Sequence, residues 1–158
     1  MNLVIGFGNP LRRDDGLGAV VANEVGHRLD VAVLAPQQLL PEHTDIVRRA
    51  LSVVFVDASI GVEPPGSVTC TAIEPAEYPA YGHVIAPADL LCLTRMAFGW
   101  VPKAWLITVA GASFEFGTQL SPAVLAAVPK VIERVETILT QPVAPDWSAP
   151  MRCAGHTI

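Results

Sequence analysis

Residues 6–18 read GFGNPLRRDDGLG and directly follow a short apolar run, NLVI at residues 2–5. An apolar run of this length that ends in glycine is typical of a strand, and the residues after it carry apolar side chains at intervals of three and four. That spacing predicts an amphipathic helix from about residue 15 to residue 29. The apolar positions of this helix are Leu17, Val20, Val21 and Val25. A strand that leads through a turn into a helix is the opening unit of an α/β fold.

The rest of the chain continues the alternation of strands and helices. Residues 52–58, SVVFVDA, predict a strand that is apolar on both faces and therefore lies in the middle of a sheet. The strand-like run at 67–73 follows too soon for a crossover helix, so we expect it to be antiparallel to 52–58. Ser121 and Pro122 predict the start of the last helix, as its cap and first residue. The other expected strands cover residues 31–35 and 104–111, and the expected helices cover 41–51, 88–98 and 121–139.

These elements define a fold class. We expect an α/β protein: a single-domain three-layer αβα sandwich with a mixed, mostly parallel five-stranded sheet. A chain of 158 residues, 51% of them hydrophobic, is long enough to bury one full core. We expect this domain to cover residues 1–140. Residues 141–158, with three prolines and little periodicity, are expected to form a loosely ordered C-terminal tail.

Charge and composition exclude several classes of protein. A net charge of −5 argues against a general nucleic-acid binder, which needs a basic face for phosphates. The N-terminus lacks a charged segment, and its apolar run is too short for a signal peptide or a membrane span, so we expect a cytoplasmic protein without a membrane partner. The three cysteines, Cys70, Cys92 and Cys153, lack metal-type spacing and are expected to be reduced thiols.

The glycines of the opening stretch raise the alternative of a nucleotide site. A dinucleotide fingerprint has a third glycine where this chain has Leu11, and a phosphate loop has Gly-Lys-Ser/Thr where it has Asp14 and Asp15. Two carboxylates at a helix N-terminus favour the helix dipole but repel a phosphate. One of them could serve as a helix cap. The pair followed by Gly-x-Gly instead indicates a cation site.

Topology supplies partners for Asp15. If the strand order is 2-1-3, ligands bind beyond the carboxyl ends of strands one and three, where the connections diverge. Asp15 follows the first strand and Asp57 ends the third, so both carboxylates are expected at this point. His83, in the loop before the helix at 88–98, is the expected third ligand, with His43 as its rival. Two carboxylates and an imidazole suit a divalent ion such as nickel or zinc with open coordination positions.

Four segments, in order, resemble the hydrogenase maturation endopeptidases, which trim the C-terminus of the nickel-containing large subunit of [NiFe] hydrogenases. GFGNPLRRDDGLG is similar to the motif G-x-G-N-x-L-x-x-D-[DE]-G-x-G of that family. The other three segments are VFVDA, GHVIAPADLL and VAGASFEFGTQLS, and the resemblance covers about residues 3 to 140.

The resemblance implies a function and a site. It implies a hydrolase, an endopeptidase that removes the C-terminal extension of a nickel-loaded large-subunit precursor and uses the bound nickel as its recognition element. By position, Asp15, Asp57 and His83 are the implied metal-binding and catalytic residues. The nickel is expected to come with the substrate, no organic cofactor is expected, and the protein is expected to be a monomer.

Three points stay open at the level of the sequence. Either a metal-polarised carbonyl with an activated water or a nearby carboxylate base would account for cleavage. Asp14 is expected to cap the helix or to orient Asp15, while Asn9 is expected to shape the turn. The alternative function is that of a non-hydrolytic metal-binding accessory protein for metalloenzyme assembly.

Overall fold

The computed structural model describes residues 1–61, 63–80 and 82–140, so the predicted tail at residues 141–158 lies outside the described residues. The elements, in chain order, are β1 (Asn2–Gly6), the 3-10 helix η1 (Arg13–Gly16), α1 (Leu17–Arg28), β2 (Ala32–Leu34), the 3-10 helix η2 (Pro41–His43), α2 (Thr44–Val47), β3 (Ser52–Ser59), β4 (Val68–Ile73), α3 (Pro87–Phe98), β5 (Lys103–Ala110) and α4 (Pro122–Thr140). No helix in this part of the chain is long and apolar enough to cross a membrane.

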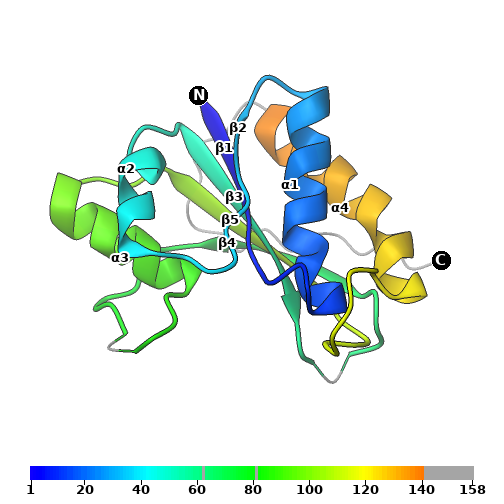
Figure 1. The fold of residues 1–158 in the computed structure, drawn as a ribbon. Coiled ribbons are helices and arrows are strands. Elements are labelled where there is room, and N and C mark those ends of the chain that lie inside the picture. The colour runs from blue at the N-terminus through cyan, green and yellow to red at the C-terminus, as the bar shows by residue number, and fades with distance from the viewer. Residues whose placement is uncertain (62, 81, 141–158) are drawn as a thin grey trace.

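The five strands form one mixed sheet in the order β2-β1-β3-β5-β4, in which only β4 runs antiparallel to its neighbour. Helices α1 and α4 cover one face of the sheet, and α2 and α3 cover the other (Figure 1). The predicted fold class is therefore confirmed. The connections from β1 and β3 diverge at the carboxyl ends of these two strands, as the predicted order 2-1-3 requires.

The position of β4 corrects one expectation. Residues 67–73 were expected to be antiparallel to the strand at 52–58, but β4 pairs with β5, which lies between β3 and β4. The direction is right and the neighbour is wrong. Strands lie about 4.8 Å apart, so the connection between Ser59 and Val68 is long enough to cross over the position that β5 occupies.

The core consists of two layers, one on each face of the sheet. Alternate residues of the strands belong to different layers, because successive side chains point to opposite faces. On one face, Val4, Val54 and Val56 pack with apolar residues of α1 and α4. On the other face, Leu3 and Phe55 pack with residues of α2 and α3. Burial on both faces explains the continuous apolar character of the central strands.

Two predicted helices differ from the observed ones. The helix expected at 41–51 is only η2 followed by a single turn, α2. It ends early because the chain turns into β3: the N–H of Ala50 bonds to Val47, and that of Leu51 donates to the carbonyl of Met1. The helix expected at 15–29 begins as η1 and becomes α-helical at Leu17.

The glycines of the opening motif allow α1 to pack closely on the sheet. A Cβ atom at Gly6 would lie 1.8 Å from the carbonyl oxygen of Gly18, and one at Gly18 would lie 2.7 Å from that of Val56. Both distances are shorter than any real contact of a Cβ atom. This close approach gives the Gly-rich sequence a structural purpose that needs no phosphate.

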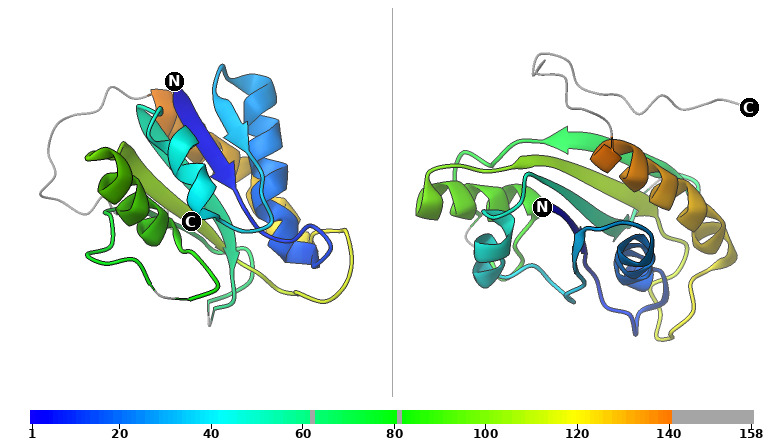
Figure 2. Two further views of the ribbon diagram at one scale, coloured as in Figure 1. Left: turned by 60° about the vertical axis from the view of Figure 1, so that its left-hand side comes forward. Right: turned by 90° about the horizontal axis from the view of Figure 1, so that it is seen from above.

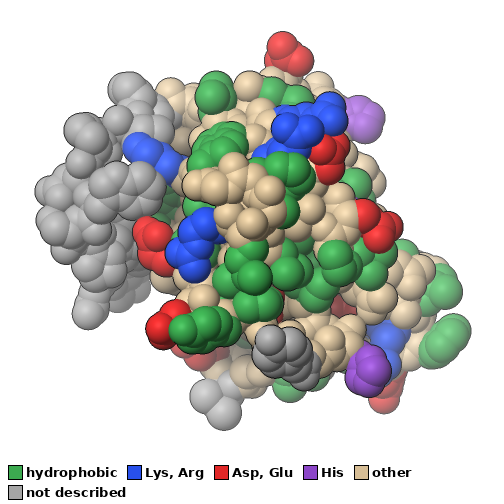
Figure 3. Space-filling model, turned by 90° about the vertical axis from the view of Figure 1, so that its left-hand side faces the viewer, with side chains coloured by type: hydrophobic (Ala, Val, Ile, Leu, Met, Phe, Trp, Pro, Cys, Tyr) green, Lys and Arg blue, Asp and Glu red, His purple; other side chains and the backbone are tan. Residues whose placement is uncertain are grey.

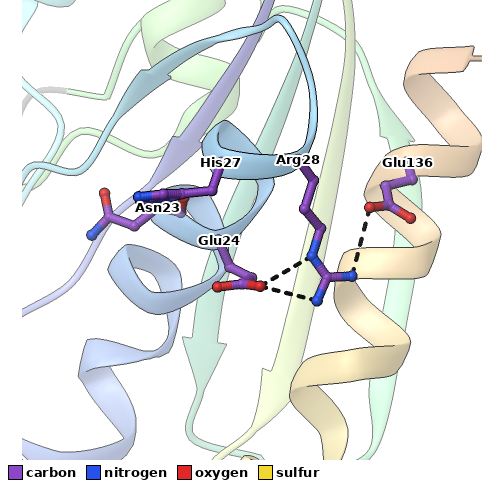
Figure 4. Close-up of polar contacts among 5 residues, drawn as sticks. All are labelled: Asn23, Glu24, His27, Arg28 and Glu136. Carbon is purple, nitrogen blue, oxygen red and sulfur yellow. Dashed lines mark hydrogen bonds and ion pairs between the residues drawn. The ribbon is translucent and has the colours of Figure 1, made fainter.

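The far end of α1 is joined to α4 by exposed ion pairs (Figure 4). Arg28 Nη2 lies 3.0 Å from Glu24 Oε1 within α1, and Arg28 Nη1 lies 3.8 Å from Glu136 Oε1 on α4. Because these side chains are largely exposed, the pairs contribute little to stability. The apolar contacts beneath them hold the two helices together.

Candidate functional site

Asp15 and Asp57 lie together at the carboxyl end of the sheet. Gly6, the last residue of β1, pairs with Val56, so Asp57 is the next residue of β3, just beyond the end of β1. Burial and, to a smaller extent, the negative charge of Asp15 raise the pKa of the Asp57 carboxyl to about 7, although a hydrogen bond from the Ala58 backbone opposes both. The predicted meeting of these two carboxylates is what the structure shows.

The Asp15 side chain is oriented by the turn that follows β1. The N–H of Asn9 donates to Asp15 Oδ2 at 2.7 Å, and the N–H of Leu11 donates to Asn9 Oδ1 at 2.9 Å. Gly8 has a φ of 135°, and a Cβ atom there would lie 2.0 Å from the Asp15 carbonyl oxygen. Asn9 therefore shapes the turn, as expected, and only glycine fits at position 8.

Asp14 serves a different purpose from the one expected of it. Neither η1 nor α1 has a side-chain cap, and the Asp14 side chain is fully buried. Its carboxylate accepts four hydrogen bonds from the loop between β5 and α4. The donors are the N–H groups of Ala112, at 2.8 Å, Ser113, at 3.0 Å, and Ser121, at 2.7 Å, and the hydroxyl of Ser121, at 2.8 Å.

This network has two consequences. Burial alone would raise the pKa of Asp14, but the hydrogen bonds from Ser121, Ser113 and Ala112 outweigh burial and lower the pKa below its usual value. The Ser121 hydroxyl, expected to cap the last helix, donates to Asp14 instead. No local pattern could have revealed this contact, because its partners are far apart in the chain.

His83 does not join the two carboxylates. It is exposed, in the loop between β4 and α3, and this loop is separate from the turn after β1 in Figure 1 and in both views of Figure 2. Within residues 1–61, 63–80 and 82–140, no group of three acidic, histidine or cysteine side chains is arranged to hold a metal ion. The structure thus gathers Asp15 and Asp57 but not the whole predicted ligand set.

The loop that carries His83 is nevertheless fixed at both ends. The carboxylate of Asp89, in the first turn of α3, accepts hydrogen bonds from the N–H of Ala80 at 2.9 Å and from the N–H of Ala86 at 3.0 Å. Asp89 is buried. The exposed residues of this loop, His83 among them, are thus presented from a defined base.

The other histidines have local partners or lie elsewhere. His43 Nδ1 accepts a hydrogen bond from the N–H of Leu40 at 3.0 Å, which occupies one ring nitrogen of the rival ligand. His27 Nδ1 lies 2.9 Å from the carbonyl oxygen of Asn23 on the exposed side of α1 (Figure 4). His156 and Cys153 lie outside the described residues, and Cys92 is a buried free thiol, as expected.

A cavity of about 270 Å³ opens at the end of β3, which also carries Asp57. Asp57 pairs with Thr108, and Thr108 pairs with Thr69, so the three side chains form a row on the face of the sheet that α2 and α3 cover elsewhere. The cavity continues from this row. Its lining residues are Ser59, Gly61, Glu63, Ser67, Thr69 and Ala110. No sequence pattern marks these residues, because the fold brings together the ends of three strands and the connection from β3 to β4.

Comparison with solved structures finds the same architecture in several peptidases. The chain is similar to the hydrogenase maturating endopeptidase HybD of E. coli, with 27% identity and a TM-score of 0.73 over 87% of this chain and 91% of that one. It is also similar to an endopeptidase of Escherichia coli, with 25% identity and a TM-score of 0.70 over 88% and 92% of the two chains. No protein-family model and no curated protein matches the sequence.

A third solved structure has the same fold. The [NiFe] hydrogenase maturation protease HybD from Thermococcus kodakarensis has 20% identity and a TM-score of 0.70 over 87% of this chain and 97% of that one. At this identity the likeness shows the shared fold alone. In every case the match covers nearly the whole of the related chain, so the similarity is not limited to a common α/β core.

Fold and neighbours together define an α/β peptidase, and the predicted hydrolase class is confirmed. More particularly, the predicted resemblance to the hydrogenase maturation endopeptidases is confirmed, because a solved structure of that name shares the fold at 27% identity.

Proposed function

We propose that this protein removes the C-terminal extension of a [NiFe] hydrogenase large-subunit precursor, and that it acts on the precursor after nickel has been inserted. In this proposal the nickel ion belongs to the substrate. Asp15, Asp57 and His83 are the residues that contact it.

The observation that carries the proposal is the paired, partly buried carboxylates of Asp15 and Asp57. Burial of a carboxylate and a second negative charge nearby are both unfavourable, and together they raise the pKa of Asp57. A divalent cation relieves the repulsion and satisfies both groups. Carboxylate oxygens alone make a weak site for nickel, so the ion needs ligands from elsewhere.

An incomplete ligand set suits an ion that arrives already bound. A closed structural site has four protein ligands, whereas the described part of the chain adds no third acidic, histidine or cysteine side chain to Asp15 and Asp57. A metal held by thiolates of the precursor could accept these two carboxylates in its open positions. We propose the imidazole of His83 as a third contact, made when the bound precursor lies between its anchored loop and the turn after β1.

The cavity at the end of β3 offers a place for the peptide that is to be cleaved. A segment of the precursor that runs past Asp57 into this space would place its backbone along the hydroxyl groups of Ser59, Ser67 and Thr69. In this arrangement Asp57 contacts the ion, at the end of β3 and beside Asp15.

The test is a cleavage assay with purified nickel-loaded and nickel-free precursor. We expect the loaded precursor to be cleaved, and the nickel-free precursor and casein to remain intact. Asp57→Asn and His83→Ala are expected to abolish cleavage. His27→Ala, which replaces an exposed histidine on α1, is the matched control and is expected to retain full activity.

Two outcomes contradict the proposal. Efficient cleavage of the nickel-free precursor would show that the ion is not the recognition element. Normal activity of His83→Ala, with Asp57→Asn inactive, would remove His83 from the site and leave the carboxylate pair as its only confirmed part.

A further inference from the structure

The turn after β1 is joined to the loop between β5 and α4 by several hydrogen bonds. We name residues 9–16 and 111–121 the loop pair; Figures 1 and 2 show the two segments side by side. The N–H of Arg13 donates to the Gly117 carbonyl oxygen at 2.9 Å. The N–H of Gly117 donates to the Leu11 carbonyl oxygen at 2.9 Å. Arg12 Nε donates to the Phe114 carbonyl at 3.1 Å. The four bonds to the buried Asp14 carboxylate complete the junction.

A large apolar side chain stands out from this rigid framework. Phe116 is 88% exposed and Leu11 is 47% exposed. The bond between Gly117 and Leu11 places the two residues next to one another. We name them the apolar tip. Neither side chain contributes to the core, so stability does not explain an aromatic residue at this position.

The tip also lies beside the candidate site. The N–H of Asp15 donates to the carbonyl of Arg12, so one short turn carries both the ligand and half of the tip. A partner whose reacting segment reaches Asp15 therefore comes close to the turn that carries Leu11 and to its neighbour Phe116.

We infer that the apolar tip is a docking element that inserts into an apolar depression on the folded surface of the precursor. This inference rests on the proposed function. The tip is exposed, so it suits a concave folded surface. The extended peptide is expected to occupy the cavity at the end of β3 instead. Because the loop pair is held by hydrogen bonds, little conformational freedom is lost when the tip is covered. Aromatic anchors of this kind carry a large share of binding energy at interfaces.

The charges of the loop pair indicate which charges should surround the depression on the precursor. The loop pair adds two positive side chains, Arg12 and Arg13, and one exposed negative side chain, Glu115, in a chain with a net charge of −5. Its rim is thus locally basic outside the carboxylate site. The matching partner surface is apolar in the middle and acidic at the edge.

A second exposed apolar group provides a control. Leu51, Met96 and Trp100 are 72%, 70% and 47% exposed. Leu51 and Trp100 precede β3 and β5, so they lie at the opposite end of the sheet from Asp57. Hydrophobic side chains also gather over the face that carries α2 and α3 (Figure 3). A substrate docked at Asp57 does not need this group.

The experiment compares Phe116→Ala and Trp100→Ala with the wild-type protein for binding to immobilised nickel-loaded precursor and for cleavage. Loss of an anchor side chain is expected to weaken binding by about tenfold or more, and to raise KM by more than it lowers kcat. The melting temperature is expected to stay within about 2 °C of the wild type, because the side chain is exposed. Trp100→Ala is expected to match the wild type in every measurement.

Three other results would contradict the docking inference. If wild-type protein cleaves the precursor and Phe116→Ala binds it within about twofold, the tip is not a docking element. Equal weakening by Trp100→Ala would show a general loss of adhesion and would also overturn the inference. If the wild-type protein neither binds nor cleaves the precursor, the proposed function fails, and the partner named for the tip fails with it.

Discussion

Burial and, after it, the carboxylate of Asp15 raise the pKa of Asp57, although Asp15 follows β1 and Asp57 belongs to β3. The two strands are neighbours in the sheet and their carboxyl ends meet at one edge. A repulsive pair of this kind lowers stability in the absence of a cation. That cost makes the pair measurable without any assay of activity.

Asp57→Asn is expected to stabilise the metal-free protein at alkaline pH. The folded state raises the pKa of Asp57 from 3.8 to about 7, so its favourable contribution is complete below pH 3.8 and is lost as the pH rises towards 7. The shift corresponds to at most about 4 kcal/mol, and partial exposure brings the expected gain to about 2 kcal/mol at pH 8. Urea unfolding at pH 8 and at pH 4 measures it. An equal effect at both pH values would contradict the assignment.

Binding of the nickel-loaded precursor is expected to weaken below pH 7. The Asp57 carboxyl must lose its proton before it can contact the ion, so protons compete with binding. Affinity should fall by about tenfold per pH unit below 7 and level off above it. Titration by biolayer interferometry between pH 5.5 and 8.5 would show this profile, and Asp57→Asn should flatten it.

Asp14→Asn is expected to destabilise the protein by about 3 kcal/mol at neutral pH, because an amide cannot accept all four hydrogen bonds and leaves buried donors unsatisfied. The folded state lowers the pKa of Asp14, so its contribution is present above pH 3.8 and is lost as the pH falls through the folded pKa. The difference between variant and wild type should therefore shrink in acid. Chemical unfolding at pH 7 and pH 3 compares the two. Asp45→Asn, at an exposed position, is the control.

Asp89→Ala is expected to loosen the loop that carries His83. The change removes the acceptor of the Ala80 and Ala86 N–H groups. We expect a loss of about 1 to 2 kcal/mol of stability and a larger relative loss of cleavage than of precursor binding. Hydrogen exchange of the Ala80 and Ala86 amides should accelerate. Unchanged exchange at both amides would mean that the loop is held by other contacts.

Arg28→Ala is expected to have little effect on the free energy of unfolding, although it removes two ion pairs. The ion pairs of Arg28 with Glu24 and Glu136 are exposed, so their loss should change stability by less than about 1 kcal/mol. Thermal unfolding at low and high salt checks this. A larger effect would show that α1 and α4 depend on this side chain for packing as well as for charge.

The sequence could predict Asp15 and Asp57 as neighbours because the information is topological. Apolar runs define the strands, the strand order follows from the crossover helices, and ligands gather where the connections diverge. The same reasoning cannot place His83, because the position of a residue within a loop does not follow from the strands at its ends, so its role stays a prediction. The reasoning failed for the β4 neighbour, since a short connection limits strand direction more strongly than strand adjacency.

Asp14 shows a different limit of sequence reasoning. An acidic residue near a helix start is usually a cap, and that expectation was wrong here. Its donors, Ala112, Ser113 and Ser121, lie in a segment with no local sign of such a partner. Buried networks between distant loops depend on the finished fold.

The bonds to Asp14 also set the order in which the site can form during synthesis. Asp15 and Asp57 are made early, but the loop that fixes the turn beside Asp15 is made only after β5, and Ser121 must emerge before the junction closes. Contacts of such long sequence separation form late in folding. A nascent chain that ends before α4 therefore carries both carboxylates without the support of their turn. We therefore expect the turn that holds Asp15 to become fully ordered only after Ser121 has been synthesised.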